Sequence, residues 1–201
     1  MSNVAVIDAD LIAYRCAASC KENDGLEIAC IRADKLIRQI LDKLAAPDYW
    51  LFLSGQTNFR YEIYPEYKAN RRDTVRPKWL QQLREYLVLD WKADVTDGYE
   101  ADDAIGIKHT ELTAVKLSPI IVTLDKDLRQ IAGIHYNFVK EELDEVSVLD
   151  GLRNFYKQLV LGDRSDNIPG FDGVARQKST KYIETVFEEI VLAQSEKMMY
   201  N

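Results

Sequence analysis

Short runs of apolar residues alternate along the chain with longer stretches in which apolar residues recur at helical spacing. The runs at 4–7, 50–53 and 120–124 are rich in β-branched or aromatic residues, which is typical of strands buried on both faces. The stretches at 31–44 and 101–115 predict amphipathic helices. Their expected apolar faces are Ile31, Leu36, Ile37, Ile40, Leu41 and Leu44 in the first helix, and Ala101, Ala104, Ile105, Leu112 and Val115 in the second. This order of strands and helices predicts an α/β fold with a mostly parallel sheet.

The pattern becomes wholly helical after about residue 150, apart from a turn-rich segment at 162–173. No internal repeat, low-complexity stretch or Pro/Gly-rich linker divides the chain. With 201 residues, of which 47% are apolar, the chain suits one compact core. We therefore expect an α/β core over 1–150 and a helical flank over 151–201.

Acidic residues gather at the ends of the predicted strands and the starts of the predicted helices. Asp8 follows the first strand, and Asp125 and Asp127 follow the run at 120–124. Because the carboxyl ends of parallel strands share one edge of a sheet, these acids are expected to converge there. Two further groups complete the set: Glu100, Asp102 and Asp103 at a helix start, and Asp163 and Asp166 in the turn-rich segment.

Several carboxylates in one pocket raise one another's pKa unless cations neutralise them. With only oxygen ligands available, the set favours Mg²⁺ or Mn²⁺ over zinc, and more than one ion. Each group also has a structural interpretation. Glu100, Asp102 and Asp103 would complement a helix dipole, Asp125 and Asp127 would cap a helix at 126–131, and Asp163 and Asp166 are ordinary turn residues.

The net charge of −7 argues against a nucleic-acid partner when taken alone. Without the eight clustered acids, however, the remaining charge is +1. Between Arg60 and Arg84, seven basic residues stand against three acidic ones, interleaved with Tyr61, Tyr64 and Tyr67. This mixture suits a phosphodiester backbone with unstacked bases, although a solvated charged face is the plainer interpretation.

Cysteine usage and hydropathy limit the location of the protein. Cys16, Cys20 and Cys30 complete neither a disulfide framework nor a four-ligand zinc site, which fits a reducing compartment. The longest apolar run, 49–53, is far shorter than a membrane span, so we expect a cytoplasmic protein without a membrane partner. His109 and His135 are expected to be structural.

Several motifs, in this order, resemble the 5'-nuclease superfamily. They are Val6-Ile-Asp8 with Tyr14-Arg15, Phe59-Arg60, Pro65-Glu-Tyr-Lys-Ala-Asn-Arg71, Gly98-Tyr-Glu-Ala-Asp-Asp-Ala-Ile-Gly106, Val122-Thr-Leu-Asp-Lys-Asp-Leu128 and Leu161-Gly-Asp-Arg-Ser-Asp-Asn-Ile-Pro-Gly170. The superfamily includes flap endonucleases and 5'-3' exonucleases, among them phage enzymes and the N-terminal nuclease domain of bacterial DNA polymerase I. The resemblance implies a PIN-like core holding two divalent ions, a helical arch or clamp at about 60–98, and a C-terminal helix-three-turn-helix that grips duplex DNA.

The resemblance also implies a role for individual residues. Asp8, Glu100, Asp102 and Asp103 would hold the first ion, and Asp125, Asp127, Asp163 and Asp166 the second. Lys68 and Arg71 would stabilise the charge that develops as metal-bound water attacks phosphorus. Contacts with DNA are expected from Arg15, Arg60, Tyr67, Arg72, Arg76, Lys78, Gly170, Gly173, Arg176 and Lys178.

The implied substrate is DNA with a 5' end, a flap or a single-strand/duplex junction, cut by a monomer during replication or repair. An RNA primer is a further candidate, and the implied setting is a bacterium or a virus in a bacterial host. Two departures from the family pattern affect the ions. Ser54 stands where many relatives carry Asp, so the first ion is expected to bind more weakly or through water. Ala175 replaces a usual Gly, which leaves K⁺ at the C-terminal turn an open expectation.

Three other functions stay open at this point. The first is a relative that holds branched DNA without cutting it, and the second is a PIN-type ribonuclease with the same metal logic. The third is a phosphatase that uses Asp8 and Asp10 as an Asp-x-Asp pair. The phosphatase is disfavoured, because it leaves the blocks around 67–68 and 162–163 without a use.

Overall fold

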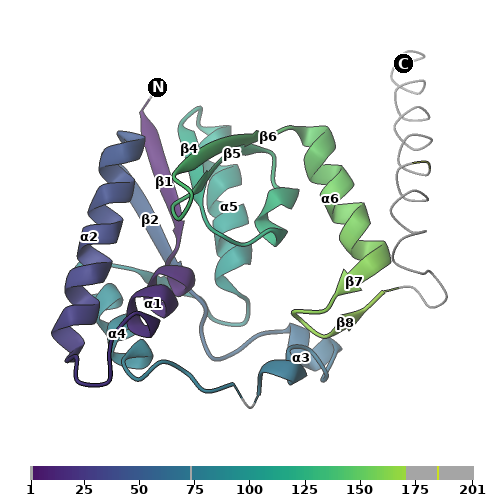
Figure 1. The fold of residues 1–201 in the computed structure, drawn as a ribbon. Helices are drawn as coiled ribbons and strands as arrows, with labels where there is room; N and C mark the ends of the chain where they lie inside the picture. Colours follow the sequence, from purple (N-terminus) through teal and green to yellow (C-terminus); the bar gives the residue numbers. More distant parts are fainter. Residues whose placement is uncertain (1, 73, 171–184, 186–201) are drawn as a thin grey trace.

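The computed structural model describes residues 2–72, 74–170 and 185, and its centre is a six-stranded sheet (Figure 1). The strands lie in the order β3-β2-β1-β4-β5-β6. The first five in this order are parallel, and β6 is antiparallel to β5. Their bounds are β1 (Asn3–Asp8), β2 (Asp48–Leu53), β3 (Asp94–Val95), β4 (Ser118–Val122), β5 (Gly133–Asn137) and β6 (Glu142–Val146). The predicted α/β fold with a mostly parallel sheet is confirmed.

Helices cover both faces of the sheet. One face packs against α1 (Ala9–Ala18), α2 (Leu26–Leu44) and α4 (Leu80–Trp91), and the other packs against α5 (Ala101–Ala114) (Figure 1). Successive side chains of a strand point to opposite faces, so Ile7 joins the first layer and Val6 the second. Both are fully buried, which explains why the apolar runs in the sequence are unbroken.

The helices differ from their predicted apolar faces in detail. The α2 helix begins five residues earlier than expected, and alanines let it approach the sheet closely. Its buried residues are Ala29, Ala33, Ile37, Ile40 and Leu44. The predicted Ile31 is 60% exposed, and Val115 lies beyond the end of α5 and is 67% exposed. Both predictions were wrong because spacing alone does not fix the centre of a buried stripe.

The expected clamp at 60–98 is shorter than predicted. Its described part holds only α3 (Arg60–Ile63) and the 3₁₀ turn η1 (Ala69–Arg71) before α4 begins. The α4 helix belongs to the core, where Leu83 and Leu87 are fully buried. The basic segment over the sheet edge therefore ends before residue 80.

The flank after residue 147 is not wholly helical. After α6 (Val148–Leu161), the strands β7 (Gly162–Asp163) and β8 (Ile168–Pro169) pair antiparallel. Gly162 adopts φ 66°, and a Cβ there would lie 2.4 Å from the Gly170 nitrogen, so only glycine fits this turn. The 3₁₀ turn η2 (Asp127–Gln130) likewise replaces the helix expected at 126–131, and α6 packs against it.

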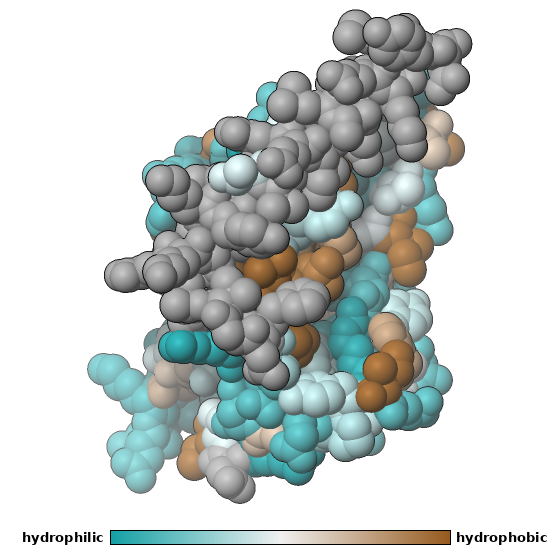
Figure 2. Space-filling view, turned by 90° about the vertical axis from the view of Figure 1, so that its right-hand side faces the viewer, coloured by the Kyte–Doolittle hydropathy of each residue, from teal (hydrophilic) through white to brown (hydrophobic). Residues whose placement is uncertain are grey.

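One face of α6 carries exposed apolar side chains (Figure 2). They are Val148, Leu149, Leu152, Phe155 and Leu159. No helix among the described residues has the length and apolar content needed to cross a bilayer. The predicted helix-three-turn-helix, with Gly173, Ala175, Arg176 and Lys178, lies outside the described residues.

Candidate active site

Three acids, which we call the inner acids, come together at the carboxyl edge of the sheet: Asp8, Asp102 and Asp125. Asp8 ends β1, caps α1 by accepting the Leu11 amide at 3.2 Å, and is 4% exposed. The hydroxyl of Thr123 donates to Asp8 Oδ2 at 3.1 Å and accepts the Asp125 amide at 3.0 Å. Since β1 and β4 are neighbouring parallel strands, one threonine joins the acids at their two ends.

Burial and repulsion by neighbouring carboxylates act in the same direction on the pKa values of Asp8 and Asp102. Burial raises the pKa of Asp8 to about 6, and the charge of Asp125 adds to this rise. Burial raises the pKa of Asp102 to about 8, with further increases from Asp8, Asp125 and Glu100. The positive charge of Lys68 opposes both rises without cancelling them. These acids therefore carry negative charge at neutral pH only at a cost, unless a cation joins them.

Three other acids, which we call the paired acids, are Glu100, Asp103 and Asp166. Lys68 Nζ lies 2.6 Å from Glu100 Oε1 and 3.8 Å from Asp166 Oδ2. Arg71 Nη2 lies 2.7 Å from Asp166 Oδ1. The two basic residues predicted to stabilise charge at phosphorus are therefore bonded to carboxylates in this structure.

Asp103 is held by a different arginine. Arg60 donates to both of its carboxylate oxygens, at 2.6 and 2.8 Å, and the Glu100 amide donates to Oδ2 at 3.0 Å. The hydrogen bonds and charge of Arg60 keep the pKa of Asp103 below its ordinary value despite burial. Asp103 therefore faces the basic segment, whereas its neighbour Asp102 faces the inner acids.

Tyr67 lies inside the group of paired acids instead of presenting its ring to solvent. It is 3% exposed, and its hydroxyl lies 2.9 Å from Glu100 Oε2 and 2.7 Å from Asp166 Oδ2. A single hydroxyl proton serves only one of these two acceptors at a time. The prediction that Tyr67 stacks on bases does not match its burial here.

Asp127 and Asp163 form a separate pair next to Asp125. Burial, Asp125 and Asp163 raise the pKa of Asp127 to about 7. Asp163 is also buried, yet hydrogen bonds from the hydroxyl and amide of Ser165 lower its pKa to about 2. Asp163 Oδ2 is buried without a hydrogen-bond partner, and Lys126 Nζ lies 3.5 Å from it. This oxygen can accept a hydrogen bond from a protonated Asp127, or it can coordinate a cation.

The structure brings the predicted ligands near one another, but the described residues do not form a complete metal-binding site. Within residues 2–72 and 74–170, no three Asp, Glu, His or Cys side chains are arranged to hold a metal ion. The paired acids are engaged by basic side chains, and Gln158 donates to Asp127. The donor chemistry nevertheless fits a hard divalent cation: the predicted ligands are all oxygens, the pKa of Asp102 is raised, and Asp163 Oδ2 is buried without a hydrogen-bond partner.

The other predicted DNA contacts occupy varied surroundings. Arg15, Arg76 and Lys78 are exposed, and Arg15 lines an open pocket between α1 and α2. Arg72 donates to the Pro65 carbonyl at 2.8 Å. Gly170 packs against the end of α6, where a Cβ would lie 2.6 Å from the Leu161 carbonyl.

Three polar residues of the site were missed by reasoning from sequence. Thr123 precedes Asp125 by two residues and Ser165 follows Asp163 by two, which is the spacing of local side-chain-to-backbone hydrogen bonds. That spacing is a usable signal. Gln158 offers none, because it lies 31 residues from its partner Asp127.

Residues 3–157 match the family model of the 5'-3' exonuclease N-terminal resolvase-like domain. The chain belongs to this 5'-3' exonuclease family. It is 28% identical to DNA polymerase I of Bacillus caldotenax over 207 residues, which covers 90% of the chain and 23% of that protein. It is also 31% identical over 152 residues to the 5'-3' exonuclease of Buchnera aphidicola, covering 67% of the chain and 49% of that protein. The chain thus spans about a quarter to half of these relatives.

A solved structure shares the fold of this 5'-3' exonuclease family member. It is the bacteriophage T5 D15 flap endonuclease in a complex with DNA and metal ions. The TM-score is 0.71 at 17% identity, and the match covers 88% of this chain and 72% of that one. The likeness confirms the expected fold class of the 5'-nuclease superfamily.

Proposed function

We propose that this chain is a divalent-metal-dependent 5' nuclease that hydrolyses DNA phosphodiesters, as a 5'-3' exonuclease, a flap endonuclease or both. The observation that carries the proposal is the state of the inner acids. Asp8 is buried and Asp102 is partly buried beside Asp125 at the carboxyl edge of the sheet, and the pKa values of Asp8 and Asp102 are raised. A cluster of carboxylates with raised pKa values is typical of a functional site, where a bound cation or a shared proton offsets their repulsion.

The position of the basic side chains supports a phosphate substrate. Lys68 and Arg71 reach across from the basic segment to Glu100 and Asp166. When these carboxylates are neutralised, the ammonium and guanidinium groups can take phosphate oxygens instead. Two cations in fixed positions beside a phosphodiester stabilise the negative charge that develops on it during hydrolysis.

The ligands of Mg²⁺ or Mn²⁺ would come from both groups of predicted acids. Asp8, Glu100, Asp102 and Asp103 would hold one ion, and Asp125, Asp127, Asp163 and Asp166 a second. A bound ion supplies an acidified water and polarises the phosphate. Ser54 supports the backbone of this site, where its hydroxyl accepts the amide of Ala101 at 3.0 Å.

The names of the similar proteins agree with this substrate and cofactor. The Buchnera relative is a 5'-3' exonuclease, and the phage protein of like fold was crystallised with DNA and metal ions. We extend DNA with a 5' end or a flap, and a divalent metal, to this chain on that basis. Cleavage as a monomer, an RNA primer as substrate and K⁺ at the C-terminal turn stay predictions.

In this structure Asp10, the second acid of the phosphatase alternative, is already engaged by other groups. Both oxygens of Asp10 are engaged, Oδ1 by the guanidinium of Arg84 and Oδ2 by the amide of Ser54 at 2.8 Å. Asp10 is therefore not free to act as a proton donor beside Asp8. The arrangement favours a metal site over an Asp-x-Asp phosphatase pair.

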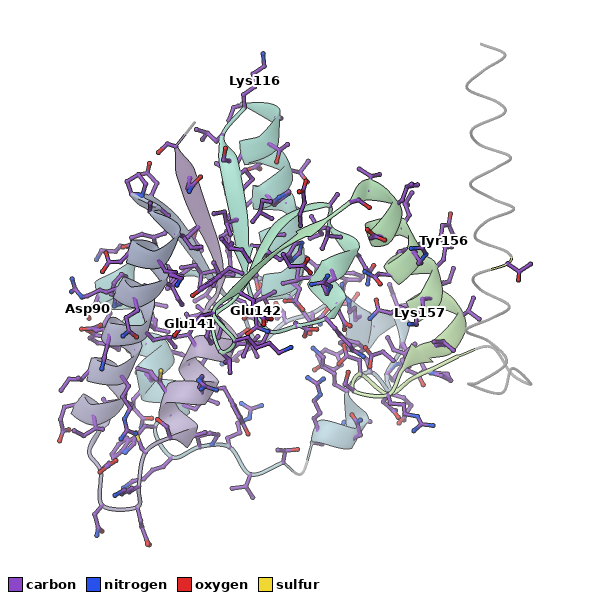
Figure 3. All side chains as sticks on the ribbon, turned by 45° about the horizontal axis from the view of Figure 1, so that its top comes forward. Asp90, Lys116, Glu141, Glu142, Tyr156 and Lys157 are labelled. Atoms are coloured by element: carbon purple, nitrogen blue, oxygen red, sulfur yellow. The ribbon has the colours of Figure 1, made fainter. Side chains whose placement is uncertain are left out.

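The direct test is to size the products from a 5'-labelled DNA flap, with Mg²⁺ and with EDTA. We expect short labelled products only with the metal, and none from Asp125→Asn. Asp90→Asn is the matched control, because Asp90 is exposed on α4, across the molecule from α6 (Figure 3). It should cut like wild type.

The same assay separates the alternatives. A gel shift of the flap without cleavage in Mg²⁺ or Mn²⁺ would support the non-cleaving relative and refute the nuclease. Faster cleavage of a matched RNA substrate than of DNA would support the ribonuclease.

A further inference from the structure

A hydrogen-bonded network outside the predicted ligand set joins three helices at the end of β2. It consists of Asp10 on α1, Ser54 directly after β2, and Arg84 on α4. We propose that this network is a positioning device that holds the start of α5, and with it Asp102, in the geometry that binds a divalent cation. The inference rests on the proposed function for the identity of that cation.

Ser54 is bonded through every polar atom it has. Its amide donates to Asp10 Oδ2 at 2.8 Å, and its carbonyl accepts from the guanidinium of Arg84. Its hydroxyl accepts the amide of Ala101 at 3.0 Å. The guanidinium of Arg84 also bonds Asp10 Oδ1, which closes the network.

The hydroxyl of Ser54 bonds to the start of α5, the helix that carries Asp102. Ala101 is the first residue of α5, and its amide is one of the donors that no carbonyl within a helix can satisfy. The flanking Glu100 and Asp103 cap two further amides with their side chains. Ser54 thus fixes the first turn of α5 to the end of β2, one residue before the inner acid Asp102.

The network is partly buried, so we expect its removal to disturb the surrounding structure. The side chain of Arg84 is 21% exposed and that of Asp10 is 29% exposed. Within the described part of the chain, neither side chain forms a hydrogen bond or ion pair with a predicted ligand, so both act through Ser54 and the backbone. Partners that orient ligands in this way commonly change metal affinity by about 10–100-fold when removed.

The fold contains a matched carboxylate that anchors the same helix elsewhere. Asp34 on α2 accepts from Tyr86 at 2.8 Å and from Trp91 at 2.7 Å, both on α4. Like Asp10, it accepts two hydrogen bonds and ties α4 to a neighbouring helix. Unlike Asp10, it has no bond to Ser54, so its loss loosens α4 without releasing α5.

The test measures Mn²⁺ binding directly, by the electron paramagnetic resonance signal of free Mn²⁺ in titrations of the full chain without DNA. We expect Ser54→Ala and Asp10→Asn to raise the Kd for Mn²⁺ about tenfold or more. Ser54→Thr keeps the hydroxyl and should restore near wild-type affinity. Asp34→Asn should lower the Tm and leave the Kd near wild type.

Arg84→Lys gives a milder variant in case Ser54→Ala does not fold, and a weakened Mn²⁺ affinity is expected from it too. Unchanged affinity in Ser54→Ala or Arg84→Lys would overturn the inference. Equal weakening in Asp34→Asn would also overturn it, because a general loosening of α4 would then explain the effect. Wild-type protein that binds Mn²⁺ but does not cut DNA would refute the proposed nuclease and leave this test intact.

Discussion

The inner acids and the paired acids lie side by side and differ in what neutralises them. Asp102 and Asp103 are consecutive residues of α5, yet burial beside other acids raises the pKa of Asp102 to about 8, whereas Arg60 keeps that of Asp103 low. Glu100 and Asp166 likewise have Lys68 and Arg71. Among residues 2–72 and 74–170, Arg60, Lys68 and Arg71 form ion pairs with the paired acids, whereas the inner acids have no ion pair and Lys68 only partly offsets the raised pKa values of Asp8 and Asp102. The difference indicates where a cation from outside is required.

The largest expected effect contrasts the two neighbours on α5. Asp102→Asn should reduce DNA cleavage by about 10³-fold, the loss typical of removing a preorganised charge from an active site. Asp103→Asn should cost less than Asp102→Asn, because Arg60 already engages both oxygens of Asp103 and leaves it a weaker ligand of the ion. Single-turnover rates on a 5' flap measure both. Equal losses would show that the two groups do not differ in function.

The next effect concerns the basic side of the comparison. Lys68→Met should lower the cleavage rate by about 10²-fold, because it removes a positive charge expected at the reacting phosphate. It should also weaken flap binding less at high salt than at low salt. Lys108→Met is the control, since Lys108 pairs with Glu111 on α5 and stacks on Trp50. Similar losses in both variants would contradict the assignment.

Metal should stabilise the protein more at high pH than at low pH. An acid whose pKa is raised on folding stabilises the fold below its ordinary pKa, and loses that contribution as pH rises through the raised value. The pKa values of Asp8, Asp127 and Asp102 are raised to about 6, 7 and 8, so the metal-free fold should lose stability from these groups as pH rises from about 4 to about 8.

Saturating Mn²⁺ should therefore raise the Tm by roughly 5 °C at pH 8, and by much less at pH 5, where Asp8 and Asp102 are already mostly neutral. Differential scanning fluorimetry with Mn²⁺ or EDTA measures the shift. In Asp102→Asn the shift at pH 8 should shrink. An equal shift at both pH values would contradict the titration of these acids.

The smallest effect comes from two histidines away from both groups. His109 on α5 and His135 on β5 are buried, and burial lowers the pKa of each, with His135 adding to the effect on His109. A lowered histidine pKa means that stability falls as pH drops below about 6.5, where the unfolded chain takes up the proton. His109→Gln should make this acid-side loss of stability smaller, measured by urea unfolding at pH 6.5 and 5. If the free energy of unfolding depends on pH in His109→Gln as it does in wild type, a group other than His109 causes the loss.

Reasoning from sequence was most successful where the backbone determines position. Unbroken apolar runs predicted the parallel strands, and the carboxyl ends of those strands placed Asp8 and Asp125 at one edge. The two-residue strands β7 and β8 have no periodicity to detect, so this part of the flank was predicted only as a turn-rich segment between helical stretches. The exposed Ile31 shows the same limit, since the alanines Ala29 and Ala33, and not Ile31, occupy the buried face in the first half of α2.

Side-chain pairing was beyond what the sequence shows. Lys68 and Glu100 are 32 residues apart, and the ion pair between them depends on how the basic segment crosses the sheet edge. The buried position of Tyr67 depends on the same crossing, which is why an aromatic in a basic stretch suggested base stacking. The Asp10–Ser54–Arg84 network spans three elements and leaves no local pattern.

The most direct test of the central claim is the pKa of the Asp102 carboxyl, followed by carbon-13 NMR with and without Mg²⁺. The account predicts a titration near pH 8 in the metal-free protein, which shifts to well below pH 6 when Mg²⁺ is added. A resonance that titrates near pH 4 without metal, or that does not respond to Mg²⁺, would contradict the claim that the inner acids are built to hold a divalent cation.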